Sequence, residues 1–291
     1  MSASSYLRKI LVVTILLSFT GCSGTQDVPS PHPSDPRYVE RGRELVNGLA
    51  ACGRCHGERP EPRSVLSGGR ELQDIYGSVP APNITAAELS GWTFSDLAKL
   101  FRTFERPDGE AVAVEHHLGF QWLSENDLYS IAAYVKSLPP VKNSVERRTL
   151  STLSSYTTGM LEKRPSVDGY VPEIPTREQT AYGKYLVDTV ARCGSCHNTE
   201  STLFSSTKYL KGGREILSSE GSAEALAPNI TSSKTFGIGE WSEAQIVRYL
   251  QSGITAENRS LGSQFCPTNF YQQAKVSDLE AIAHYLLTVE G

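Results

Sequence analysis

The sequence predicts an all-α protein built from two tandem domains of one kind, and three observations carry that prediction. The pentapeptide Cys-x-x-Cys-His occurs twice, at residues 52–56 and 193–197. Other segments recur in register with it, which several unrelated strings would not do together. An amphipathic pattern led by serine closes each half of the chain, at residues 124–138 and 277–287, and predicts a helix with a serine N-cap in each case.

The recurring segments follow one another in the same order in both halves. A predicted helix lies before each pentapeptide and contains Arg-Gly-Arg-Glu-Leu-Val from Arg41 in one copy and Tyr-Gly-Lys-Tyr-Leu-Val from Tyr182 in the other. After each pentapeptide come Gly-Gly-Arg, at 68–70 and 212–214, and Ala-Pro-Asn-Ile-Thr, where we expect long loops. A tryptophan-led stretch then predicts a short helix in each copy.

The pentapeptide predicts one covalently bound c-type haem in each half. Two thiols three positions apart on a helical turn can add to the two vinyl groups of one porphyrin, and the adjacent imidazole then points at the iron. A zinc site would need four ligands close together, and a thioredoxin-like motif would follow a strand and has no obligatory histidine. We therefore expect thioethers from Cys52, Cys55, Cys193 and Cys196. The proximal iron ligands are expected to be His56 and His197.

These features resemble those of two-domain, two-haem cytochromes c of the bacterial cell envelope, such as the cytochrome subunits of membrane-bound alcohol and sugar-acid dehydrogenases. The pentapeptides carry the resemblance together with Pro-Asn-Ile-Thr, Gly-Ile-Gly-Glu-Trp-Ser and the closing Asp-Leu-x-x-Ile-Ala-x-Tyr helix. It implies two tandem cytochrome c domains, each with one covalently bound c-type haem, over residues 38–140 and 176–291. A linker or strap over 141–175 joins them. It also implies that the Pro82 and Pro228 carbonyls accept the proximal histidine protons.

The second axial ligands are not the usual ones of the resembling family, in which a Met-Pro pair precedes the closing helix. The chain has two methionines, Met1 and Met160, and neither stands in that place. In the first half His116 and His117 stand there, and one of them is expected to bind the first haem. His116 needs the smaller shift in register. The other interpretation is that both are exposed loop histidines. In the second half Cys266 precedes a proline, so thiolate ligation and an open or weakly ligated iron both remain open.

The N-terminus has the layout of a secretory signal, because Arg8-Lys9 precedes an apolar run that ends in Thr-Gly-Cys22. Small residues before a cysteine resemble a bacterial lipoprotein cleavage site. We expect a signal peptide over residues 1–21, acylation of Cys22 and a flexible tether over 22–37, with plain secretion or an uncleaved anchor as alternatives. Haem attachment of this type is completed outside the bacterial cytoplasm, so both signals predict a periplasmic, lipid-anchored protein of the cell envelope.

The composition is that of an ordinary globular protein, with 39% hydrophobic and 21% charged residues. The formal net charge of −4 argues against nucleic acid as a partner. The resemblance implies an electron carrier that has redox proteins as partners. It would pass electrons between a dehydrogenase or quinol-oxidising complex and a downstream acceptor, and no separate catalytic residues are expected. The alternative is a haem enzyme, similar to thiosulfate dehydrogenases or peroxidases, that uses the second haem; Cys266 is the feature that favours it.

Overall fold

The computed structural model describes residues 35–152, 165–200 and 206–291, which all belong to one compact unit. The expected signal peptide, the lipidation site Cys22 and Met160 lie outside the described residues. Among the described residues, no helix combines the length and apolar character needed to cross a membrane. We call residues 35–140 the N-terminal half and residues 175–291 the C-terminal half.

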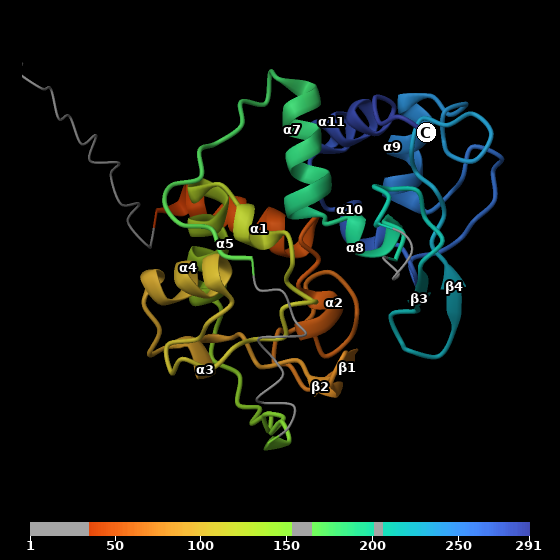
Figure 1. Ribbon diagram of the computed structural model, residues 1–291. Helices are drawn as coiled ribbons and strands as arrows, with labels where there is room; N and C mark the ends of the chain where they lie inside the picture. The colour runs from red at the N-terminus through yellow and green to blue at the C-terminus, as the bar shows by residue number, and fades with distance from the viewer. Residues whose placement is uncertain (1–34, 153–164, 201–205) are drawn as a thin grey trace, which may run out of the picture. The chain divides into compact units, whose positions relative to one another are not determined.

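The described chain is helical with few strands, as predicted, and both halves share the order of opening helix, pentapeptide helix, hairpin, tryptophan-led helix and closing helix (Figure 1). The N-terminal half contains α1 (Pro36–Asn47), α2 (Gly53–His56), β1 (Glu71–Asp74), β2 (Gly77–Pro80), α3 (Ala86–Leu89), α4 (Phe94–Thr103), the 3₁₀ helix η1 (Phe120–Trp122) and α5 (Glu125–Ser137). The C-terminal half contains α7 (Gln179–Tyr185), the π-helix η2 (Leu186–Val190), α8 (Gly194–His197), β3 (Glu215–Leu217), β4 (Glu224–Leu226), α9 (Glu243–Ser252), α10 (Thr268–Tyr271) and α11 (Val276–Leu286).

Two small antiparallel hairpins interrupt what the sequence predicts as loops. Glu71 pairs with Pro80 at the open end of the β1–β2 hairpin, and Glu215 pairs with Leu226 in β3–β4. Both hairpins connect the Gly-Gly-Arg segment to the Ala-Pro-Asn-Ile-Thr segment. They therefore bring the two ends of each loop together beside the pentapeptide.

The opening and closing helices of each half cross at a glycine. Helix α1 packs against α5, and α7 packs against α11. A β-carbon built on Gly42 would lie 1.9 Å from the Ser130 carbonyl oxygen, and one on Gly183 would lie 2.0 Å from that of Ala281. The glycine of the repeated Arg-Gly-Arg and Tyr-Gly-Lys segments is thus required by the close approach of the two backbones.

Of the two predicted serine caps, one is confirmed and one is wrong. Ser124 caps α5 by accepting from the Asp127 amide at 3.2 Å. The structure adds capping boxes at the start of the two tryptophan-led helices, α4 and α9. The expected N-cap at Ser277 is wrong, because α11 begins at Val276 and places this serine in its first turn. Lys275 occupies the cap position without a side-chain hydrogen bond to the helix.

The described ends of the linker bind to the N-terminal half. Asn143 donates from its side chain to the Ser67 carbonyl at 2.9 Å, and Arg148 forms an ion pair with the buried Asp74 at 2.6 Å. Further along, the Glu125 amide donates to the Val171 carbonyl at 3.0 Å. These contacts hold the loop beside the first pentapeptide against the connector.

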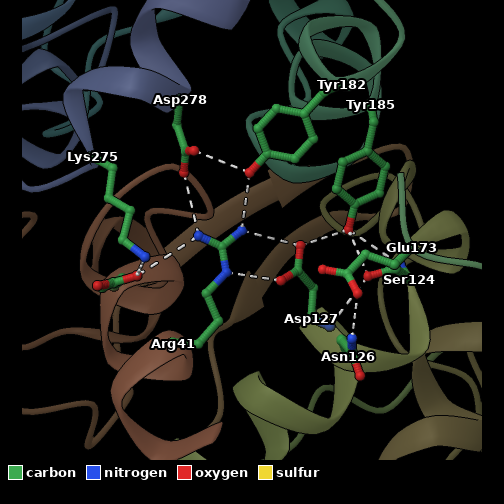
Figure 2. Close-up of polar contacts among 10 residues, drawn as sticks. Arg41, Ser124, Asn126, Asp127, Glu173, Tyr182, Tyr185, Lys275 and Asp278 are labelled. Carbon is green, nitrogen blue, oxygen red and sulfur yellow. Dashed lines mark hydrogen bonds and ion pairs between the residues drawn. The ribbon is translucent and has the colours of Figure 1, made fainter. Parts of the chain in front are cut away.

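The two halves meet through a polar network centred on Arg41 of α1 (Figure 2). Its guanidinium binds Asp127 of α5, with 2.9 Å between Nε and Oδ1, and Asp278 of α11, with 3.3 Å between Nη1 and Oδ2. Tyr182 donates to Asp278 at 3.0 Å, and Tyr185 donates to Asp127 at 2.8 Å. Arg41 and Tyr182 occupy equivalent positions of the repeat, so one cation serves the closing helices of both halves.

Candidate haem sites

Each pentapeptide forms one helical turn. The His56 amide donates to the Cys52 carbonyl and the His197 amide to the Cys193 carbonyl, both at 2.9 Å. The turn places the two cysteines and the histidine of each motif within reach of one flat group. The same backbone appears twice, which is the geometry that the repeated pentapeptide predicts.

The histidine of each pentapeptide is oriented by a proline carbonyl. His56 Nδ1 lies 2.8 Å from the Pro82 oxygen, and His197 Nδ1 lies 2.8 Å from the Pro228 oxygen. Donation from Nδ1 leaves Nε2 without a proton and free to bind a metal. Burial lowers the pKa of both imidazoles, so both are neutral at neutral pH, as ligation requires.

The repeated loop segments hold these carbonyls in place. Asn83 accepts through Oδ1 from the Thr85 amide at 2.9 Å, and Asn229 accepts in the same way from the Thr231 amide at 2.8 Å. Gly68, at a φ of 73°, donates to the His56 carbonyl, and a β-carbon there would lie 2.4 Å from the Pro82 carbonyl carbon. The Pro-Asn-Ile-Thr and Gly-Gly-Arg strings therefore serve one purpose: they pack a fixed carbonyl against the histidine.

The four pentapeptide cysteines are half-buried and form no disulfide. Burial raises the pKa of Cys52 to about 12 and also raises the pKa of Cys55 and Cys193, so these thiols are neutral. The five described cysteines are all free thiols, with no disulfide between them. Across residues 35–152, 165–200 and 206–291, no group of three or more His, Cys, Asp or Glu side chains is arranged so that it could hold a metal ion, as a zinc site would require. Neutral sulfurs beside an oriented imidazole fit covalent haem attachment.

In the N-terminal half His117 faces His56. Their ring centroids lie 6.3 Å apart, with 48° between the ring planes. Metal–imidazole bonds are about 2 Å long, so this spacing leaves room for one metal ion between the two rings. His117 Nδ1 lies 2.9 Å from the Ala113 oxygen, and burial lowers the pKa of His117 to about 3, so its ring is neutral as well.

The geometry favours His117 over His116, the residue that needed the smaller shift in register. A helical turn begins at Val114, whose carbonyl accepts from the His117 amide at 2.8 Å. This turn directs His117 toward His56. Nε2 of His116 is buried and has no hydrogen-bond partner in the described structure. Register alone could not resolve this, because the turn changes which of two neighbouring side chains points inward.

In the C-terminal half the half-buried Cys266 lies one residue before the N-cap of α10, beside the second pentapeptide. Its sulfur interacts electrostatically with the Cys193 and Cys196 thiols, and the Tyr249 hydroxyl is also close enough to interact with it. Burial raises the pKa of Cys266 to about 12. A metal ion that binds such a sulfur displaces its proton outright. Cys266 is thus the additional cysteine that lies beside the second pentapeptide.

Comparisons with known proteins come from sequence relatives, since no family model matches the chain. The fructose dehydrogenase cytochrome subunit of Gluconobacter japonicus is 27% identical over 96% of this chain and 58% of its own length. The cytochrome c subunit of the alcohol dehydrogenase (quinone) of Gluconobacter oxydans is 27% identical over 87% of this chain and 55% of its own length. A diheme cytochrome c-type protein of Cereibacter sphaeroides is 27% identical over 97% of this chain and 98% of its own length.

The class of protein to which the helical fold and the two pentapeptide sites point is the c-type cytochrome. More particularly, the chain is a distant homologue of cytochrome c subunits of alcohol and fructose dehydrogenases and of a diheme cytochrome c, which confirms the resemblance drawn from the motifs. The chain spans little more than half the length of the two dehydrogenase subunits and nearly all of the diheme protein.

Proposed function

We propose that this chain is a dihaem c-type cytochrome that carries electrons in the bacterial cell envelope between a dehydrogenase or quinol-oxidising complex and a downstream acceptor. The observation that carries the proposal is the matched pair of pentapeptide turns, each with its histidine Nδ1 at 2.8 Å from a proline carbonyl. The proposed cytochrome c domains cover residues 38–140 and 176–291, with residues 141–175 as the strap between them.

A c-type haem, when bound, supplies an iron that gains and loses one electron. The residues of the chain hold and orient it: Cys52 and Cys55 in the first domain, and Cys193 and Cys196 in the second, attach the porphyrin through thioethers. The proximal imidazoles of His56 and His197 are fixed by the proline carbonyls, which also raise their basicity. Apolar core side chains pack against Cys52 and Cys193 and would shield part of each bound haem from water.

We propose His117 as the second axial ligand of the first haem and Cys266 as that of the second. The facing rings of His56 and His117 support the first assignment. The burial of Cys266 beside Cys193 and Cys196 supports the second, and an open iron is the alternative there. Neither ligand set is the His/Met pair that raises the potential of ordinary cytochromes c.

The partners and location are proposed from the relatives and the N-terminus. The relatives are named as subunits of alcohol and fructose dehydrogenases, so a dehydrogenase is the electron donor that we propose. Export through a signal peptide over residues 1–21 and a lipid on Cys22 would place the chain at the periplasmic face of a membrane. The relatives' names give no support to the alternative, a haem enzyme that uses the second haem.

The test is expression in a bacterium whose periplasmic machinery attaches c-type haem. Intact mass and a pyridine haemochrome assay should give two haems per chain. Replacing Cys52 and Cys55 with alanine should leave one haem, and the matched replacement of Cys193 and Cys196 should leave the other. In a redox titration the oxidised protein should then take up two electrons per chain. A wild-type chain that matures with one haem or none would overturn the proposal.

A further inference from the structure

One arginine lies directly before the second pentapeptide and another lies inside the first. Each donates to backbone carbonyls of the other half. Arg192, the residue before Cys193, donates from Nη1 to the carbonyl of His116. Arg54, inside the first pentapeptide, donates from Nη2 to the carbonyl of Phe265 at 2.9 Å and to that of Gln264 at 3.1 Å. His116 directly precedes His117, and Phe265 directly precedes Cys266. Each arginine therefore holds the peptide unit in front of the proposed sixth ligand of the opposite site.

Arg192 is built into this position rather than resting on a surface. Its guanidinium carbon lies 4.1 Å from the centroid of the Phe120 ring, a cation–π contact. Its stem packs on Gly119, where a β-carbon would lie 2.9 Å from Arg192 Cγ. The Nε atom is buried without a hydrogen-bond partner in the described structure. Burying a guanidinium with an unsatisfied donor costs free energy. We therefore expect the contact of Arg192 with the backbone before His117 to have a function.

Arg54 belongs to a second set of contacts of the same kind. The Gln264 carbonyl that it binds also accepts from the Ser219 amide at 2.7 Å. Arg70, another residue of the N-terminal half, donates to the Ser219 carbonyl. The backbone in front of Cys266 is thus held directly by Arg54 and indirectly by Arg70, both from the half that carries the first pentapeptide.

The two contacts are not copies of one feature of the repeat. Aligning the pentapeptides places Ala51 opposite Arg192 and Ser195 opposite Arg54. Ala51 and Arg192 share the left-handed backbone, with φ values of 47° and 52°. Each half thus supplies an arginine where the other half has a short side chain, so the crossed pair does not follow from the repetition itself.

We propose that Arg54 and Arg192 are positioning residues in a crossed arrangement, each fixing the sixth-ligand segment of the haem site in the other half. The inference rests on the proposed haem sites. Ligation of each iron then depends on a side chain next to the pentapeptide of the other haem, and the two sites are structurally coupled. Loss of a hydrogen bond from a charged donor shifts a local equilibrium by about one to two powers of ten.

The test uses the two-haem holoprotein with Arg192→Met and Arg54→Met, which keep an apolar stem and remove the donor. Arg63→Met is the matched control, because Arg63 also crosses to the C-terminal half, donating to Gln273 Oε1 at 3.1 Å, but touches neither ligand segment. Low-temperature electron paramagnetic resonance and carbon monoxide binding report each iron separately. Variants that retain one haem supply the reference spectra.

We expect Arg192→Met to raise the open, carbon monoxide-binding fraction of the first haem about tenfold or more and to leave the second haem unchanged. Arg54→Met should do the reverse, and Arg63→Met should do neither. Arg192→Lys and Arg54→Lys retain a charged donor and should restore most of the wild-type signal. If one methionine variant does not fold, the methionine variant of the other arginine is judged by the same crossed criterion.

The inference is overturned if each variant alters the haem of its own pentapeptide, if both haems respond equally, or if neither responds. These outcomes leave the proposed function standing, provided that the wild-type chain carries two haems. A wild-type chain without two haems defeats the proposed function instead, whatever the arginine variants show.

Discussion

Arg41 forms an ion pair with Asp278, 237 residues further along the chain, with 3.3 Å between Nη1 and Oδ2 (Figure 2). The same guanidinium binds Asp127, and nearby acidic and phenolic groups raise its pKa despite the cost of burial. Two mostly buried carboxylates on the two closing helices therefore share one cation. This arrangement ties the two halves together in addition to the apolar core that they share.

Replacing Arg41 with methionine is expected to destabilise the folded protein by about 3 kcal/mol, because it leaves two largely buried carboxylates facing one another without a cation. The free energy of unfolding of the holoprotein in guanidinium chloride measures this. Arg37→Met is the control, since Arg37 is 87% exposed and an exposed ion pair contributes less than about 1 kcal/mol. Equal losses of unfolding free energy in the two variants would mean that the network contributes no more stability than a surface ion pair.

The glycine crossings make a second prediction. Alanine normally favours a helix over glycine by about 1 kcal/mol, so a destabilising change to alanine is diagnostic of a steric clash. We expect Gly42→Ala and Gly183→Ala each to cost about 2 kcal/mol or more, because the new methyl group would meet a carbonyl oxygen of the closing helix. Thermal unfolding measures the effect. Gly91→Ala, with no atom within 4 Å of the added carbon, should be close to neutral, and a similar loss there would contradict the argument.

The spin state of the first haem should distinguish the His117→Ala variant from the His116→Ala variant. His117→Ala removes the ring that faces His56 at 6.3 Å and should convert the oxidised haem from low spin to high spin, whereas His116→Ala should keep it low spin. Optical and electron paramagnetic resonance spectra of the oxidised protein make the comparison. The opposite pattern would return the ligand to His116, the residue that needs the smaller shift in register.

Cys266→Ser should change the spectrum of the second haem alone. Removal of a sulfur donor alters the ligand field of that iron, while neither proposed axial ligand of the first haem, His56 or His117, is changed. Tyr249→Phe is a useful companion, because it removes a hydroxyl that interacts with the sulfur and should shift the second-haem spectrum without abolishing ligation. A spectrum unchanged by Cys266→Ser would make this cysteine a packing residue.

Both midpoint potentials are expected to lie below that of an ordinary His/Met cytochrome c, since imidazole and thiolate favour the oxidised iron more than a thioether does. Spectroelectrochemical titration of the wild-type protein tests this directly. His117→Met should raise the potential of the first haem and leave that of the second nearly unchanged. Two high potentials in the wild-type protein would rule out both ligand assignments.

The sequence by itself determined the parts of this protein that depend on local geometry. A Cys-x-x-Cys-His turn, a serine or threonine cap and a Pro-Asn-Ile-Thr loop are each specified by a few neighbouring residues. The helical class and the Ser124 cap were therefore predictable, and the structure confirms them. The carbonyls of Pro82 and Pro228 at the two histidines were implied by the family resemblance, and the structure confirms these contacts as well. The repeat made them more evident, because each pattern could be read twice.

Only the tertiary structure decided the features that depend on distant parts of the chain. Which of His116 and His117 faces His56 depends on the turn at Val114 and on the packing around it. The crossed contacts of Arg54 and Arg192 join residues 211 and 76 positions apart, and nothing near either arginine in the sequence indicates its partner. Long-range contacts are set by how helices and loops pack, so local patterns specify the two sites and the packing of the halves specifies how the sites are joined.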